Sequence, residues 1–125
     1  MTKAVFLDRD GTINEDAGHI TDPTLFELIP ESIEAMNKLR IAGFCLPLIT
    51  NQAGVGRGLM TEHQLNRVLD AFQKLLKEEG TYLDGVYYCP HHPEEAIGAY
   101  KQVCDCRKPG PEMLHRAAKD LDIDL

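Results

Sequence analysis

The chain has 125 residues, and 20 Asp and Glu against 13 Lys and Arg give it a net charge of −7. Hydrophobic residues make up 43% and charged residues 26%, an ordinary globular composition that excludes disordered and collagen-like chains. The acidic balance argues against a nucleic-acid partner, because phosphate backbones bind basic surfaces. This length predicts a single domain with a modest core, over residues 1–125.

Neither a membrane span nor a signal peptide is expected from the hydropathy pattern. The unbroken apolar runs are only a few residues long, whereas a spanning helix needs about 20. The first residues lack the apolar core of a signal peptide, so we expect no membrane partner and a cytoplasmic location. In that compartment the four cysteines are expected to be thiols or metal ligands rather than disulfides.

The first half of the chain predicts two buried strands separated by a helix. In chain order we expect a strand over 4–7, a tight turn over 8–12, an ordered loop or small flap over 13–30, a helix from Glu31 to Gly43 and a strand over 44–49. Pro47 conflicts with the second strand, because proline cannot donate to a ladder and usually sits at an edge or a bulge. The apolar residues on both sides of it still favour a strand.

The second half repeats this alternation. We expect a loop over 51–60, a helix over 61–80, a strand over 83–88, a loop over 89–106 and a last helix from Pro111. Thr61 and Gln64 have the spacing of a capping box, and the apolar stripe behind them has clear helical periodicity. The order predicts an α/β fold, a Rossmann-like parallel sheet with helices on both faces. Functional groups in such sheets gather at the carboxyl ends of the strands.

Two carboxylates, Asp8 and Asp10, directly follow the first predicted strand. One can act as a nucleophile while the other carries a proton, and Mg²⁺ favours such a pair because it prefers oxygen ligands. Gly11 permits the turn that presents them. Read alone, the pair is equally compatible with an Asp-Gly turn whose acids are solvated.

Three further segments offer groups that bind phosphate oxygens. Thr50 and Asn51 follow the second strand, Arg107 and Lys108 precede the last helix, and Arg57 lies in a glycine-rich loop. In an acidic protein these cations are candidates for neutralising a phosphoryl group. Taken singly, each has a simpler interpretation: a polar strand exit, a solvated basic pair and a mobile loop cation.

Three sulfurs and one imidazole fall within eighteen residues: Cys89, His91, Cys104 and Cys106. This donor set suits tetrahedral Zn²⁺, and four protein ligands leave no open position, so the metal would be structural. Its role would be to hold an irregular loop that carries the two cations before the last helix. His92 is an alternative to His91 as ligand, and a set of unrelated thiols is the alternative to a metal site.

Together these segments resemble one enzyme superfamily, and the resemblance covers essentially the whole chain. Asp-Arg-Asp-Gly-Thr at 8–12, Thr-Asn at 50–51 and Lys108 before a later helix resemble the haloacid dehalogenase superfamily of phosphohydrolases. Cys-Pro-His-His-Pro at 89–93 and Cys-Asp-Cys-Arg-Lys-Pro at 104–109 narrow the resemblance to its heptose-bisphosphate phosphatases. Histidinol-phosphate phosphatases, which have a similar zinc loop, are the alternative.

The resemblance implies Mg²⁺-dependent removal of the 7-phosphate of D-glycero-D-manno-heptose 1,7-bisphosphate through an aspartyl phosphate. It implies that Asp8 is the nucleophile and Asp10 the general acid and base, with both also holding Mg²⁺. The remaining implied roles are phosphoryl binding by Thr50 and Asn51, charge neutralisation by Lys108, sugar-phosphate recognition by Arg57 and Arg107, and zinc ligation by Cys89, His91, Cys104 and Cys106.

One family feature is missing from the sequence. A further acidic motif, Gly-Asp-x₃-Asp, supplies another Mg²⁺ carboxylate after the next strand, and no such motif follows Leu125. The predicted sheet also lacks that strand, so we expect a C-terminally truncated domain. The alternative to truncation is a natural short form with impaired metal binding. For the function, a non-catalytic, zinc-stabilised module of the fold is a competing hypothesis. We expect the partner to be a small sugar phosphate and the chain to be a monomer.

Overall fold

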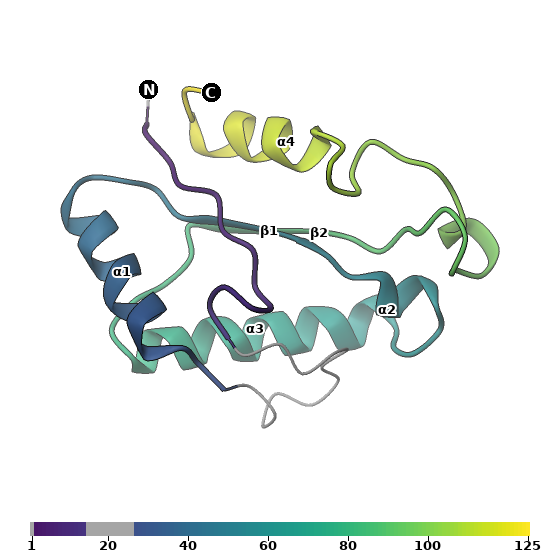
Figure 1. Cartoon of the computed structure of the whole chain (residues 1–125), viewed down its shortest axis with the longest axis horizontal. Coiled ribbons are helices and arrows are strands. Elements are labelled where there is room, and N and C mark those ends of the chain that lie inside the picture. Colours follow the sequence, from purple (N-terminus) through teal and green to yellow (C-terminus); the bar gives the residue numbers. More distant parts are fainter. Residues whose placement is uncertain (1, 15–26) are drawn as a thin grey trace.

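The computed structural model describes residues 2–14 and 27–125, so most of the loop or flap predicted over 13–30 lies outside the described residues. It is a mixed α/β structure with a small parallel sheet, as predicted. The elements are α1 (Pro30–Ile41), β1 (Pro47–Asn51), α2 (Ala53–Gly56), α3 (Glu62–Glu78), β2 (Gly85–Cys89), the 3₁₀ helix η2 (Gly98–Tyr100) and α4 (Glu112–Leu121). In Figure 1, α4 lies on one side of the strands and α1 and α3 on the other.

The centre of the sheet is β1, which pairs in parallel with β2 from Pro47 opposite Gly85 to Asn51 opposite Cys89. On its other side β1 is flanked by the N-terminal segment. There the Leu7 N–H donates to the Pro47 carbonyl at 3.0 Å, and the Ile49 N–H donates to the Leu7 carbonyl at 2.8 Å. The strand predicted over 4–7 is therefore present as an extended, paired segment.

This pairing consists of isolated bridges, not the regular strand that the sequence predicted, and Pro47 is the reason. The Val5 N–H donates to the Cys45 carbonyl at 2.9 Å, one step before Pro47 along the ladder. The next bond would need an N–H at Pro47, which proline does not have. Pro47 is accordingly the first residue of β1, which begins three residues later than predicted.

The two ends of the described chain meet at the outer edge of the N-terminal segment. The Thr2 N–H donates to the Asp122 carbonyl at 2.8 Å, and the Asp124 N–H donates back to the Thr2 carbonyl at 3.0 Å. Thr2 and Ile123 thus form a parallel bridge, and both termini lie side by side in Figure 1. The residues after α4 extend the sheet by one more pairing.

Hydrophobic residues are buried on both sides of the sheet. Leu48 of β1 belongs to a cluster with α1 and α3, whose buried members are Ile13, Met36, Leu46, Leu48, Val55, Met60, Leu65, Val68, Leu69, Phe72, Leu76 and Leu83. Ile49, its neighbour in β1, belongs to a second cluster beneath α4, with Tyr87, Cys89, Cys106, Met113, Ala117 and Ile123. Successive strand residues point to opposite faces, which explains why Leu48 and Ile49 are both apolar although they are neighbours.

The helix ends follow the sequence signals closely. The Gln64 N–H donates to the Thr61 hydroxyl at 3.1 Å and the Thr61 N–H donates to the Gln64 side chain at 2.8 Å, which confirms the capping box. Gly43, just past α1, has a φ of 92°, a left-handed conformation that favours glycine. Two details differ: the loop predicted over 51–60 contains the short α2, and Pro111 caps α4 rather than beginning it.

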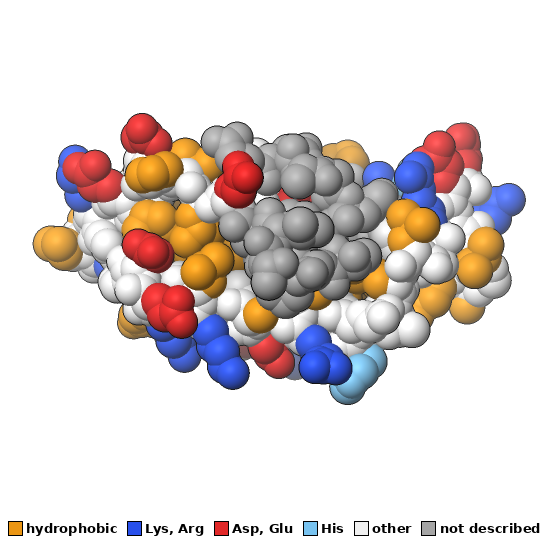
Figure 2. All heavy atoms as spheres, turned by 90° about the horizontal axis from the view of Figure 1, so that it is seen from below, with side chains coloured by type: hydrophobic (Ala, Val, Ile, Leu, Met, Phe, Trp, Pro, Cys, Tyr) orange, Lys and Arg blue, Asp and Glu red, His pale blue; other side chains and the backbone are white. Residues whose placement is uncertain are grey.

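The face formed by α1 and α3 carries charges of both signs. Figure 2 shows acidic and basic side chains spread around this face, with hydrophobic side chains between them. Such a mixed surface gives a phosphate backbone no continuous basic stripe on the drawn part of this face. Among the described residues, every helix is too short or too polar to cross a membrane.

Candidate functional site

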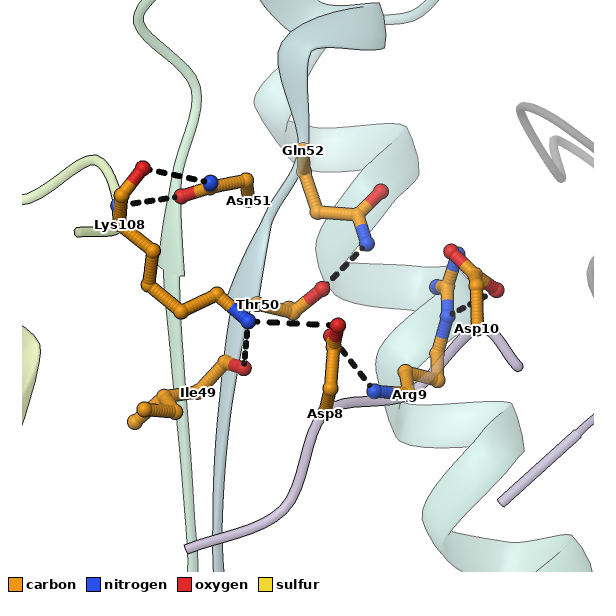
Figure 3. Close-up of polar contacts among 8 residues, drawn as sticks. All are labelled: Asp8, Arg9, Asp10, Ile49, Thr50, Asn51, Gln52 and Lys108. Carbon is orange, nitrogen blue, oxygen red and sulfur yellow. Dashed lines mark hydrogen bonds and ion pairs between the residues drawn. The ribbon is translucent and has the colours of Figure 1, made fainter. Parts of the chain in front are cut away.

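Asp8 lies where the N-terminal segment leaves the sheet, beside the carboxyl end of β1. The Lys108 ammonium is 3.3 Å from Asp8 Oδ2, and the Arg9 N–H donates to Asp8 Oδ1 at 2.8 Å. The Asp8 side chain is 46% exposed, so its carboxylate is accessible to a ligand. Figure 3 shows Asp8 pointing toward Thr50 and Lys108. We call Asp8, Thr50, Asn51 and Lys108 the sheet-edge cluster.

Lys108 is held in this cluster by Asn51, although 57 residues separate them. The Lys108 N–H donates to Asn51 Oδ1 at 2.9 Å, and Asn51 Nδ2 donates to the Lys108 carbonyl at 3.3 Å. The Lys108 ammonium also donates to the Ile49 carbonyl at 3.1 Å. The segment before α4 is thus fixed to β1, and its ammonium is directed at Asp8.

Thr50 is buried at the same edge, with 1% of its surface exposed. Its hydroxyl oxygen accepts a hydrogen bond from Gln52 Nε2 at 2.9 Å. Because that amide occupies an acceptor position of the hydroxyl, the Thr50 O–H proton is directed elsewhere and can be donated. Figure 3 places the hydroxyl close to the Lys108 ammonium and the Asp8 carboxylate.

Asp10 has cationic and amide partners of its own. Arg9 Nε donates to Asp10 Oδ1 and an Arg9 terminal nitrogen donates to Asp10 Oδ2, both at 3.0 Å. Asn14 Nδ2 adds a third bond, to Oδ1, at 3.1 Å. Gly11, with a φ of 79°, makes the turn that brings Asn14 back to Asp10. The two carboxylates therefore lie on one turn, with different cations.

Four ligand atoms converge at the end of β2 and in the loop before α4. They belong to Cys89, His91, Cys104 and Cys106, which we call the Cys/His cluster, and all lie within 4.8 Å of one another. His91 Nδ1 is 3.3 Å from the Cys106 sulfur and 3.7 Å from the Cys89 sulfur. His92 Nδ1 instead accepts the N–H groups of Glu94 and Glu95. The geometry thus favours His91 over His92 as the ligand.

The structure joins Cys89 and Cys106 in a disulfide, where the sequence predicted thiols or metal ligands. The physical reason is convergence, because the sulfurs of this cluster are close enough for two of them to join when oxidised. Zinc needs both as thiolates, so the disulfide and a metal site are two states of the same positions. In the reduced state the donor set is three thiolates and one imidazole, which fits tetrahedral Zn²⁺.

The two other predicted arginines lie in different surroundings. An Arg107 terminal nitrogen donates to the His91 carbonyl at 3.3 Å. This bond links the Cys/His cluster to the segment that carries Lys108. Arg107 and Lys108 both line a cavity of about 340 Å³. Arg57 forms an ion pair with Glu95 beside a separate cavity of about 390 Å³. Arg107 is therefore next to Lys108 both along the chain and at this cavity, whereas Arg57 is paired with Glu95.

Glu62, the first residue of α3, ties this helix to the loop that carries the cluster. Its carboxylate accepts the Tyr88 hydroxyl at 2.7 Å and the Tyr100 hydroxyl at 2.8 Å. The hydrogen bond to Glu62 raises the pKa of Tyr100, and burial together with the same carboxylate raises the pKa of Tyr88. Both phenols therefore remain protonated donors beyond their ordinary pH range.

Sequence reasoning missed Arg9 and Asn14 as members of the site. The sequence assigned Arg9 only to the turn over 8–12 and Asn14 only to the loop or flap over 13–30, yet both side chains are fully buried and bind Asp10. The available signal was the position of Arg9 between two acids, directly after a buried strand. A cation there is expected to pair with one of them, because a buried charge without a partner is costly.

No family model matches the chain. Curated proteins do match: the D-glycero-beta-D-manno-heptose-1,7-bisphosphate 7-phosphatase of Pasteurella multocida (strain Pm70) is 48% identical over 124 residues, or 99% of this chain and 67% of that protein. The chain spans about two thirds of the length of the curated relatives that it matches, from 64% to 67%.

Two solved structures share the fold. One, from Mesorhizobium loti and described as a HAD-like phosphatase, has a TM-score of 0.92 and 36% identity and covers 98% of this chain and 59% of that one. The other is a D,D-heptose 1,7-bisphosphate phosphatase from B. bronchiseptica complexed with magnesium and phosphate, with a TM-score of 0.81, 34% identity and coverage of 99% and 66%. With this identity and coverage, the chain belongs to the HAD-like phosphatase family that includes the heptose-bisphosphate phosphatases.

Proposed function

We propose that this chain carries the machinery of a Mg²⁺-dependent phosphomonoester hydrolase that removes the 7-phosphate of D-glycero-D-manno-heptose 1,7-bisphosphate. The observation that carries the proposal is the exposed Asp8 carboxylate, 3.3 Å from the Lys108 ammonium and beside the buried Thr50 hydroxyl. The names of the curated relatives support the substrate. The parallel pairing around β1, with helices on both sides, supports a Rossmann-like sheet as the scaffold.

The proposed reaction has two steps, both using Asp8 and Asp10. Asp8 Oδ attacks phosphorus, forming an aspartyl phosphate while the bond to the sugar oxygen breaks, and Asp10 gives its proton to that oxygen. Asp10 then takes a proton from water, which attacks phosphorus and breaks the bond to Asp8, releasing phosphate. Splitting one difficult displacement into two lowers each barrier.

The neighbouring groups act on the charge of the phosphoryl group. The Lys108 ammonium is positioned to offset the charges of Asp8 and of the phosphoryl oxygens. The Thr50 O–H is free to donate to one of those oxygens, since its acceptor side is occupied by Gln52. Asn51 contributes by holding the Lys108 backbone, in addition to the phosphate contact that the resemblance implies.

The residues present fit the two metals that the family implies. Asp8 offers an exposed carboxylate and Asp10 a backbone carbonyl, and Mg²⁺ commonly binds one or two protein oxygens together with waters and substrate phosphate. When bound there, Mg²⁺ supplies positive charge that stabilises the transferring phosphoryl group. The Cys/His cluster would hold a structural Zn²⁺ in its reduced state.

Arg107 and Arg57 are proposed to recognise the rest of the sugar phosphate. Arg107 lies beside Lys108 at the cavity before α4, within reach of a ligand bound there. Arg57 would have to exchange its ion pair with Glu95 for a phosphate of the substrate. Both side chains are partly exposed, so the exchange requires no change in the core.

The test is phosphorus NMR of heptose 1,7-bisphosphate incubated with the chain, with and without Mg²⁺. We expect Mg²⁺-dependent loss of the 7-phosphate and no loss with Asp8→Asn. Faster hydrolysis of histidinol phosphate would reassign the substrate. Absence of hydrolysis of either ester by a folded chain would contradict the proposal and favour a non-catalytic module.

A further inference from the structure

We infer that Arg9 and Asn14 are positioning residues that hold the Asp10 carboxylate so that its Oδ2 atom exchanges the proton. This inference rests on the proposed function, because it assigns the geometry of the proposed general acid and base. The family resemblance and the sequence patterns gave neither residue a role. The observation is the set of three donors around one carboxylate, two of them from one buried arginine and the third from Asn14. Figure 3 shows the Arg9 guanidinium against the Asp10 carboxylate.

The guanidinium of Arg9 holds Asp10 as a rigid fork. Its side chain is 0% exposed, whereas that of Asp10 is 23% exposed. Two parallel bonds of 3.0 Å fix both the place and the plane of the carboxylate, which a single lysine ammonium does not do. Burial adds to this rigidity, because a buried cation that lost its carboxylate partner would carry a large energetic penalty.

The backbone of the turn fixes Arg9 from the other end. The Arg9 carbonyl accepts the N–H groups of Thr12, Ile13 and Asn14, at 3.2, 2.9 and 3.3 Å. The Gly11 N–H donates to the Asn14 carbonyl at 2.7 Å, which closes the same turn. Both donors to Asp10 thus belong to one hydrogen-bonded unit, and the carboxylate is held relative to Asp8 on the same turn.

The donors are distributed unequally over the two oxygens of Asp10. Oδ1 receives Arg9 Nε and Asn14 Nδ2, whereas Oδ2 receives one Arg9 terminal nitrogen. A carboxylate offers about four acceptor positions, two on each oxygen. Among the described residues, the recorded bonds fill both positions of Oδ1 and leave one on Oδ2. That remaining position is where a leaving-group oxygen or a water can exchange a proton.

The experiment separates proton transfer from all other steps by changing the leaving group. Benzyl phosphate releases an alkoxide that needs a proton, whereas p-nitrophenyl phosphate releases a phenolate that does not. With the chain in excess and Mg²⁺ present, release of the alcohol or phenol reports only formation of the aspartyl phosphate. We expect Arg9→Lys to slow benzyl alcohol release about 10- to 100-fold and nitrophenol release less than about 3-fold.

Three further variants make the result specific. Asn14→Ser removes only the third donor, should give the same pattern with a smaller effect, and provides the test if Arg9→Lys does not fold. In an Asp10→Asn background Arg9→Lys should cause no further loss, because both changes act on one proton transfer. Arg116→Lys changes an exposed arginine that pairs with Glu112 on α4, and is the matched control expected to change neither rate.

The outcomes distinguish this inference from the proposed function. Selective slowing of benzyl phosphate by Arg9→Lys or Asn14→Ser, in chains with unchanged melting temperatures, supports the inference. Equal slowing of both esters, or additive losses with Asp10→Asn, overturns it while leaving the phosphatase assignment intact. An unchanged chain that hydrolyses neither ester overturns the proposed function and this inference with it.

Discussion

The sheet-edge cluster and the Cys/His cluster share the segment before α4, which carries Cys106 and Lys108, but are built in opposite ways. The sheet-edge cluster joins residues from three distant segments, and its Asp8 carboxylate is 46% exposed. The Cys/His cluster comes from two nearby segments, and its four ligand atoms face one another within 4.8 Å. The sheet-edge cluster keeps an accessible carboxylate that can bind a ligand, which suits a reaction. The Cys/His cluster directs its ligand atoms at one another, which suits structural support.

A short segment connects the two clusters. Arg107 donates to the His91 carbonyl, and the Gly110 N–H donates to the Arg107 carbonyl at 2.7 Å. Lys108 lies between Arg107 and Gly110 in the sequence, and its ammonium forms an ion pair with Asp8. Changes in the Cys/His cluster should therefore act first on stability and only indirectly on rate, whereas changes at the sheet edge should act mainly on rate.

The largest effect is expected for Asp8→Asn. Loss of the nucleophile should lower Mg²⁺-dependent phosphate release by a factor on the order of 10³ or more. The melting temperature should stay close to that of the unchanged chain, because the side chain is exposed. Asp70→Asn, an exposed acid on α3, is the matched control. A large loss of stability in Asp8→Asn would contradict the division of roles between the clusters.

Cys104→Ser tests the supporting role of the Cys/His cluster. If the cluster holds zinc, the variant should lose the metal and about 3 kcal/mol or more of unfolding free energy, measured by urea denaturation and metal analysis. Cys45→Ser, outside the cluster, should keep the metal. If the variant keeps its unfolding free energy until a reductant is added, the loop is stabilised by the disulfide between Cys89 and Cys106 and not by a metal.

Asn51→Ala tests the clamp that positions Lys108. Two hydrogen bonds to the Lys108 backbone are lost, so phosphate release should fall about 10- to 100-fold and stability by about 1–3 kcal/mol. Gln102→Ala, which removes an exposed amide bonded to the Ala99 carbonyl, is the control. A rate equal to that of the unchanged chain would show that Lys108 does not depend on the clamp.

The smallest effect concerns alkaline stability. Burial, with the hydrogen bond to Asp120, raises the pKa of Tyr87 from 10.0 to about 12. The unfolded chain therefore loses this proton first, and stability should fall as pH rises from 10 toward about 12. Tyr87→Phe should lose less stability over that range in urea titrations at several pH values. An identical alkaline loss in both chains would contradict the assignment.

Features set by local sequence were the most predictable. The capping box of Thr61 and Gln64 starts α3 where expected, because both partners lie within one turn. The Cys/His cluster was also accessible, since its ligands occur as two closely spaced pairs. Sequence reasoning identified its membership but not the disulfide within it, because spacing does not fix the oxidation state.

Long-range contacts were much less predictable. The missing Pro47 N–H interrupts the ladder to the N-terminal segment, an effect that depends on which carbonyl lies opposite. The bonds of Asn51 to the Lys108 backbone span 57 residues, and no local pattern indicates them. The role of Arg9 was unpredictable for another reason. A charged residue in a turn is usually solvated, whereas Arg9 is fully buried.

The most direct test of the account is to identify the residue that carries the phosphoryl group during turnover. The chain, mixed with heptose 1,7-bisphosphate and Mg²⁺, would be quenched rapidly and treated with borohydride, which reduces an aspartyl phosphate to homoserine. Peptide mapping by mass spectrometry should then find homoserine at position 8. A modified residue elsewhere, or phosphate release without any trapped acyl phosphate, would contradict the role assigned to Asp8.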